Sequence, residues 1–282
     1  MKAARALIDH EIRIVIEDAA GRRLAPRGHA DDTLAALAAA QTGATDAWEP
    51  APSGELTLLS PVATAGKIVA VGLNYADHTS ETGFTPPEKP LTFAKYPSSL
   101  TGPTADVAVP DHLTRSVDYE VELAVVIGRT CGGESEATLA DVAGYTIAND
   151  LSARDVQFAD TQWTRAKSFD GFTPLGPWIV TSDEFDVTAP HRIRTEVDGE
   201  LLQDDSTTGM VFDVPELLRF IGDGTTLEAG DIILTGTPAG AGGFRTPPRY
   251  LQHGETVVAS IEGLGELSNR ILYRSRAATK ES

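Results

Sequence analysis

The stretch that decides the fold reads Asp118-Tyr119-Glu120-Val121-Glu122-Leu123, followed by the apolar run Ala124-Val125-Val126-Ile127. Glycines at positions 128, 132 and 133 come next, and an apolar run bounded by turn residues predicts a buried strand. Because side chains alternate along a strand, Asp118, Glu120 and Glu122 should share one face.

Three carboxylates on one face of an apolar strand repel one another, and burying each of them unpaired is costly. Two arrangements remove that cost. Water can solvate the face, as on an edge strand, or a hard divalent cation such as Mg²⁺ or Mn²⁺ can bind there. The stretch alone leaves both open.

Composition limits the classes of protein to which the chain can belong. The 282 residues are 41% hydrophobic and 23% charged, which is ordinary for a globular protein. The net charge of −18 argues against nucleic-acid binding. No signal peptide is expected, and no run approaches the roughly 20 apolar residues of a membrane span, so no membrane partner is expected. The single Cys131 fits a reducing compartment, and we expect a cytoplasmic protein.

Local patterns predict more strands than helices. Residues 42–54 are rich in Ala, Pro and Gly and indicate a boundary, so we expect a small N-terminal domain (1–62) and a main domain (63–282). Asp198-Gly199 predicts a hairpin turn, and Ser152 with Asp155 resembles the cap of a short helix. Strands are expected at 12–16, 67–72, 145–148, 232–235 and 256–261, and helices at 33–38, 75–81, 155–158 and 215–220. The sequence therefore predicts a mostly β core with a few outer helices, an α+β fold.

Three further segments carry candidate chemistry. In a helix from residue 75, His78 and Glu81 would share a face as a general-base pair, although these residues alone favour a surface helix with an incidental pair. Asp150 ends a predicted strand and is either a site residue or a turn residue. Lys167 alone would more often be solvated than functional.

Taken together, the motifs resemble the fumarylacetoacetate hydrolase superfamily. The segments that match it in order, across about residues 66–272, are Gly72-Leu73-Asn74-Tyr75-Ala76-Asp77-His78, Asp118 to Leu123, Asn149 to Gln157, Ala166-Lys167-Ser168-Phe169, Gly176-Pro177-Trp178 and Thr235-Gly236-Thr237-Pro238. The resemblance implies a mixed β-roll, usually in a homodimer.

The resemblance also implies roles for single residues. Glu120, Glu122 and Asp150 match the ligands of the family's Mg²⁺ or Mn²⁺, with Asp118 beside them rather than among them. His78 and Glu81 match its water-activating pair, and Lys167 matches its active-site lysine. Gln157 and Thr237 match substrate-contacting residues.

The implied activity is cleavage of a C–C bond in a 2,4-dioxo acid, acylpyruvate-like or a diketo sugar acid, through a metal-stabilised enolate. Leu73 departs from acylpyruvase-type members, which often carry Arg there, and this argues against a simple acylpyruvate. The alternative is an isomerase or decarboxylase of a 2-oxo diacid such as 2-hydroxyhepta-2,4-dienedioate or oxaloacetate. A non-catalytic protein that binds an acidic metabolite is a remote alternative. The expected partner is in each case a small anionic dicarbonyl or 2-oxo acid.

Overall fold

The apolar run forms β11 (Val121–Ile127), and all seven of its residues are buried. The structure is a computed structural model that describes residues 1–26, 32–44, 48–52, 54, 56–83, 85 and 87–275. Odd-numbered side chains of β11, such as Leu123 and Val125, pack into one hydrophobic cluster, and Ala124 and Val126 pack into another. A strand with a core on each face has to be apolar throughout, which is why this run does not alternate with polar residues.

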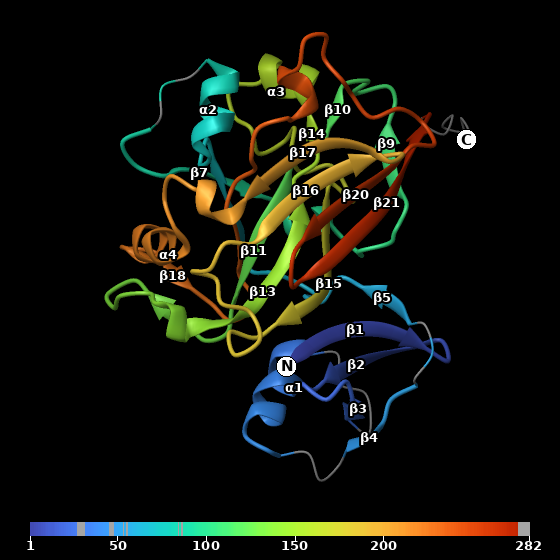
Figure 1. The fold of residues 1–282 in the computed structure, drawn as a ribbon, viewed down its shortest axis with the longest axis vertical. Helices are drawn as coiled ribbons and strands as arrows, with labels where there is room; N and C mark the ends of the chain where they lie inside the picture. The colour runs from blue at the N-terminus through green and yellow to red at the C-terminus, as the bar shows by residue number, and fades with distance from the viewer. Residues whose placement is uncertain are drawn as a thin grey trace, which may run out of the picture.

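Strand β11 lies inside a large, mixed sheet (Figure 1). In order across the sheet its strands are β4 (Trp48–Pro50), β3 (Arg23–Pro26), β2 (Glu11–Glu17), β1 (Lys2–Ile8), β15 (Thr173–Val180), β13 (Val142–Asn149), β11, β19 (Ile232–Leu234), β6 (Ile68–Gly72) and β7 (Leu91–Lys95), with β5 (Thr57–Leu59) on β1 and β8 (Leu100–Thr101) on β15.

A second sheet packs on the first through the cluster that holds Leu123 and Val125. Its order is β17 (Glu200–Ser206), β16 (Arg192–Val197), β20 (Thr256–Ile261), β21 (Gly265–Arg274) and β9 (Val107–Pro110). Two short ribbons pair β10 (Val117–Asp118) with β14 (Ser152–Ala153), and β12 (Cys131–Gly132) with β18 (Thr226–Leu227). The turn at Asp198-Gly199 joins β16 to β17, as predicted.

Helices are few and short among the described residues. The α-helices are α1 (Thr33–Gln41), α2 (Ala76–Thr82), α3 (Arg154–Ala159) and α4 (Val214–Gly222), and the 3₁₀ turns are η1 (Pro97–Ser99), η2 (Leu139–Asp141), η3 (Thr207–Gly209) and η4 (Gly242–Phe244). Asp32 caps α1 by accepting from the amides of residues 34 and 35, and Asp213 caps α4. The prediction of a mostly β fold with a few helices is confirmed.

Two local predictions were wrong. The stretch from Asp118 to Leu123 is not one continuous strand, because β10 ends at Asp118 and β11 begins at Val121. The chain changes partner there, from β14 to β13. Ser152 does not cap α3, since its hydroxyl donates to the carbonyl oxygen of Asp150.

The strand directions bring four loops to one edge of the large sheet. Strand β11 runs antiparallel to β13 and β19, and β19 runs parallel to β6. The beginning of β11 therefore meets the ends of β13, β19 and β6. Glu122, Asp150, Thr237 and the helix α2 that carries His78 all lie at this edge.

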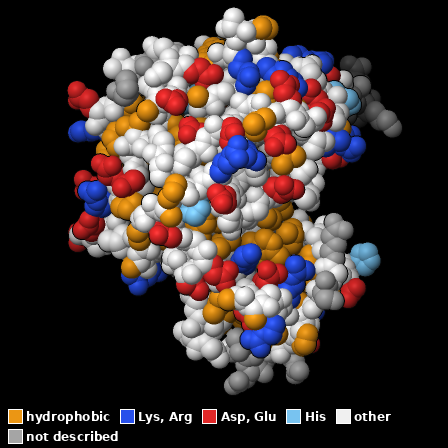
Figure 2. All heavy atoms as spheres, in the orientation of Figure 1, with side chains coloured by type: hydrophobic (Ala, Val, Ile, Leu, Met, Phe, Trp, Pro, Cys, Tyr) orange, Lys and Arg blue, Asp and Glu red, His pale blue; other side chains and the backbone are white. Residues whose placement is uncertain are grey.

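The N-terminal strands extend the same sheet, since β1 pairs with β15 at Lys2↔Val180 and Ala3↔Ile179. In Figure 1 they form, with α1, a lobe that protrudes from the main body. Figure 2 shows hydrophobic side chains gathered where lobe and body meet, and charges of both signs mixed elsewhere on this face. Within the described ranges, no helix is long and apolar enough to cross a membrane.

Candidate active site

Three buried carboxylates meet at the shared edge of the strands. One oxygen atom from each of Glu120, Glu122 and Asp150 lies within 4.8 Å of the other two, and the three residues are at most 5% exposed. Glu120 stands just before β11, where its amide donates to Asn149 Oδ1 at 3.0 Å and its carbonyl accepts from the Asp150 amide at 2.8 Å. The backbone contacts therefore hold two of the three carboxylates beside each other.

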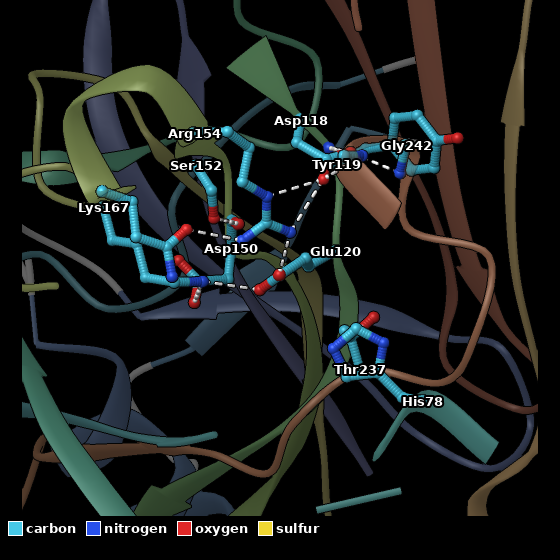
Figure 3. A network of polar contacts seen from close by, with 12 residues as sticks. His78, Asp118, Tyr119, Glu120, Asp150, Ser152, Arg154, Lys167, Thr237 and Gly242 are labelled. Carbon is cyan, nitrogen blue, oxygen red and sulfur yellow. Dashed lines mark hydrogen bonds and ion pairs between the residues drawn. The ribbon is translucent and has the colours of Figure 1, made fainter. Parts of the chain in front are cut away.

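Three buried cations neutralise part of this charge. Lys167 Nζ lies 2.6 Å from Glu120 Oε2 and 2.7 Å from Asp150 Oδ2. Lys95 Nζ contacts Asp150 Oδ1 and donates to the Phe172 carbonyl at 2.8 Å. Arg154 contacts Glu120 Oε1 and lies 2.7 Å from Asp118 Oδ2 (Figure 3). Each cation is thus already bound to the protein's own carboxylates.

Glu122 differs from its neighbours because no Lys or Arg of the described residues contacts it. Its Oε2 accepts from the Gly236 amide at 2.6 Å. Burial, with the nearby Asp150 and Glu120 carboxylates, raises the pKa of Glu122 well above its ordinary value. Burial alone would also raise the pKa of Glu120, but Lys167 and Arg154 lower it overall. When Glu122 is ionised, its charge is therefore the one that no lysine or arginine of the described residues balances by direct contact.

This donor set fits a hard divalent cation. The ligand atoms are all carboxylate oxygens, which Mg²⁺ and Mn²⁺ prefer, and each oxygen has a second lone pair beyond the one that a lysine uses. Four carboxylates, Asp118 included, face three cations in this cluster. The excess negative charge is of the sign that such an ion would compensate.

His78 and Glu81 lie one turn apart on α2, beside the carboxylates. His78 is 5% exposed, and its Nδ1 lies 3.5 Å from Glu81 Oε2, an ion-pair separation rather than a short hydrogen bond. Burial raises the pKa of Glu81, but His78 and the Gly240 amide, 2.9 Å away, outweigh it and lower that pKa. Glu81 is therefore a carboxylate placed to orient the imidazole and to stabilise its protonated form.

The loop after β19 is tied to the acidic cluster by Asp118. The amides of Gly242 and Gly243 donate to the two oxygens of Asp118 at 2.7 and 2.8 Å (Figure 3). The same carboxylate holds Arg154, whose guanidinium lies 4.9 Å from the centre of the Phe244 ring. Asp118 thus contacts the loop and an arginine, and its place beside the metal ligands stays a prediction.

A cavity of about 100 Å³ opens over these groups. The predicted site residues that line it are His78, Glu120, Glu122, Asp150, Gln157, Lys167 and Thr237. Glu81 is not in the lining and lies behind His78. The structure thus brings the predicted residues together, while their roles stay predictions.

Sequence reasoning missed several participants. Lys95 ends strand β7 and is 2% exposed, and a single lysine there gave no signal in the sequence. Arg154 lies within the motif from Asn149 to Gln157, but nothing in its spacing indicated that it would bind Asp118, Glu120 and Gln157 Oε1 together. Asn74 joins three segments, because its amide group bonds to Phe212 and to the Thr235 carbonyl. Only contacts distant in sequence reveal these residues.

Most of the chain is similar to proteins of one known family. Residues 67–272 match the model of the family described as fumarylacetoacetate (FAA) hydrolase C-terminal. The chain is 45% identical over 227 residues to a mitochondrial oxaloacetate tautomerase of Bos taurus, which covers 78% of this chain and 71% of that protein.

Solved structures are similar over almost the whole chain. A fumarylacetoacetate hydrolase from Exiguobacterium antarcticum has a TM-score of 0.84 and 40% identity, with 97% of this chain and 100% of that chain covered. A 2-hydroxyhepta-2,4-diene-1,7-dioate isomerase from Mycobacterium marinum has a TM-score of 0.74 and 34% identity, with 97% and 99% covered.

Proposed function

This chain belongs to the fumarylacetoacetate hydrolase family, and from that premise we propose that it is a divalent-metal-dependent enzyme that interconverts the enol and keto forms of a small 2-oxo acid. The observation that carries the proposal is the unbalanced Glu122 carboxylate beside Glu120 and Asp150, at the floor of a cavity that His78 also lines. Relatives named as a tautomerase and an isomerase support this chemistry more than the C–C hydrolysis that the sequence favoured.

Glu120, Glu122 and Asp150 would hold the ion, Mg²⁺ or Mn²⁺. Bound there, the ion would supply polarisation of the 2-oxo group and stabilisation of negative charge on its oxygen. Lys167, a buried cation beside two of the ligands, adds positive charge next to that oxygen. Gln157 and Thr237, which both line the cavity, supply hydrogen-bonding groups.

His78 is the group that would move the proton. Its Nδ1 is turned to Glu81, so Nε2 is the ring nitrogen left for the substrate. In the enol-to-keto direction, the enol O–H proton leaves oxygen and a proton is added at C3, so no atom is gained or lost. Glu81 stabilises the imidazolium formed in between.

A second candidate, hydrolytic C–C cleavage of a 2,4-dioxo acid, is supported by the same His78–Glu81 pair. There His78 would take a proton from water, which then attacks the distal carbonyl. Decarboxylation of oxaloacetate would need the enolate stabilisation but no attacking water.

One set of assays separates these activities. The decay of enol oxaloacetate and enol phenylpyruvate is followed by absorbance with Mg²⁺ or Mn²⁺, beside acetylpyruvate cleavage and CO₂ release. We expect accelerated enol decay that is lost with a chelator and in Glu122→Ala, which should also lose bound metal. Phe220→Ala, at an exposed position of α4 outside the cavity, is the control. The proposal would be contradicted if the enol decayed no faster with the protein than without it, or if the chelator had no effect on the rate.

The division at residue 62, the homodimer and the cytoplasmic location remain part of this proposal. The family match begins at residue 67, close to the proposed boundary. Limited proteolysis and sedimentation of the full chain test the first two, and fractionation of the native cells tests the third.

A further inference from the structure

The outer half of the cavity is apolar, in contrast to its charged floor. Leu73, Phe93, Phe158, Trp163 and Phe244 line it from five separate segments. Phe93 and Trp163 meet edge to face, with ring centres 5.4 Å apart at 72°. Phe158 and Phe244 meet in the same way at 6.4 Å and 76°. Each pair is thus packed edge to face, and the ring surfaces that line the cavity offer an apolar wall on which a flat apolar group can pack.

Phe158 is the exposed member of this wall. It stands on α3, one residue after Gln157, and its side chain is 64% exposed. Leaving much of an aromatic ring in water forgoes the favourable free energy of burying it. A substrate group that packs on the ring would recover part of that burial.

The described residues of the cavity lining offer no unpaired positive charge to a second substrate carboxylate. Arg154, Lys167 and, beneath them, Lys95 are each bound to the protein's own carboxylates. A divalent ion would turn the single excess negative charge of the cluster into a single positive one, which one substrate carboxylate balances. Among the described lining residues, no other lysine or arginine is available to bind a second substrate carboxylate.

We propose that the cavity selects a 2-oxo acid with one carboxylate and a flat apolar substituent, such as an aryl group, over a diacid, and that Phe158 determines this selection. The inference rests on the proposed function for the 2-oxo acid head group. The inference adds the chemistry of the substituent that the 2-oxo acid carries. Both the aromatic wall and the absence of a free cation in the described lining indicate that this substituent is apolar.

Two ligands that cannot enolise allow the contribution of the substituent on the 2-oxo group to binding to be measured separately from catalysis. Benzoylformate carries a phenyl ring on its 2-oxo group, and mesoxalate carries a second carboxylate there. Neither has a C3 hydrogen, so binding is measured without turnover. Titration calorimetry with the Mn²⁺-loaded protein gives both dissociation constants for the wild type, Phe158→Ala, Phe158→Leu and the control Phe220→Ala.

We expect benzoylformate to bind the wild type about tenfold more tightly than mesoxalate, the ratio that follows from burying one face of a ring. Phe158→Ala should lose most of that advantage and leave mesoxalate within about twofold, because only the phenyl group touches the wall. Phe158→Leu should retain part of the advantage, and Phe220→Ala all of it. Since Phe158 is largely exposed, its replacement should not disturb folding.

The inference is overturned if mesoxalate binds as tightly as benzoylformate, if benzoylformate does not bind, or if Phe158→Ala weakens both ligands equally. Its failure can be told from failure of the proposed function. Selective binding without enol turnover would refute only the function. Turnover of enol oxaloacetate with tighter mesoxalate binding would refute only the selectivity.

Discussion

Replacing Glu122 by Gln should stabilise the metal-free protein, whereas the same replacement at Glu120, two residues earlier, should destabilise it. Both side chains are buried and both changes keep the size of the side chain. The difference lies in their partners. Glu120 neutralises Arg154 and Lys167, and Glu122 accepts only from the Gly236 amide among the described residues.

The magnitudes follow from these contacts. At a pH above the raised pKa of Glu122, Glu122→Gln removes an uncompensated buried charge while its amide oxygen can still accept from Gly236, and we expect a gain of about 1–2 kcal/mol in the free energy of unfolding there. Glu120→Gln leaves two buried cations short of a partner and should cost about 3 kcal/mol. At about 2 °C of Tm per kcal/mol, the variants should differ by roughly 10 °C.

The pH dependence has a definite sign. The folded-state pKa of Glu122 lies above its ordinary value of 4.5. Between pH 4.5 and that raised pKa, the folded chain therefore holds a proton on Glu122 that the unfolded chain has released. The stability contributed by that proton is complete below pH 4.5 and is lost as the pH rises through the folded-state pKa. The difference in stability between wild type and Glu122→Gln should therefore widen as the pH rises.

Urea unfolding in the presence of a chelator, at several pH values, measures the change in the free energy of unfolding for each variant and the pH dependence of the Glu122→Gln effect. Both variants should also bind Mn²⁺ more weakly than the wild type. A Glu122→Gln protein less stable than the metal-free wild type, or as destabilised as Glu120→Gln, would refute the charge balance from which the metal site was argued.

Three further changes test other contacts. Lys95→Met should lower the free energy of unfolding by about 3–5 kcal/mol in urea titrations, because Asp150 loses a buried partner; an unchanged midpoint would contradict this. Asp118→Asn should cost about 2 kcal/mol through the weakened contact with Arg154, yet leave the Mn²⁺ content intact; loss of metal would instead make Asp118 a ligand. Asp32→Ala should cost about 1 kcal/mol by calorimetry through the lost cap of α1, and Asp32→Asn, which keeps an acceptor, should cost much less; equal losses would show that the cap is not the cause.

Much of the fold and of the candidate site was already determined by the sequence. The apolar run of β11, the Asp198-Gly199 turn and the caps at Asp32 and Asp213 are local features, and local side-chain and backbone preferences specify them. Carboxylates next to a buried strand need either water or a compensating cation, and the family motifs then favoured the cation and pointed to Asp150.

Only the tertiary structure decided how that charge is distributed. The break between β10 and β11 separates Asp118 from Glu120, and Arg154 then joins them from α3. Lys95 and Lys167 approach Asp150 from segments 55 and 17 residues away. The aromatic wall likewise comes from five segments that share no pattern. Which carboxylate remains without a cation depends on distances between strands far apart in sequence, and those distances exist only once the sheets have packed.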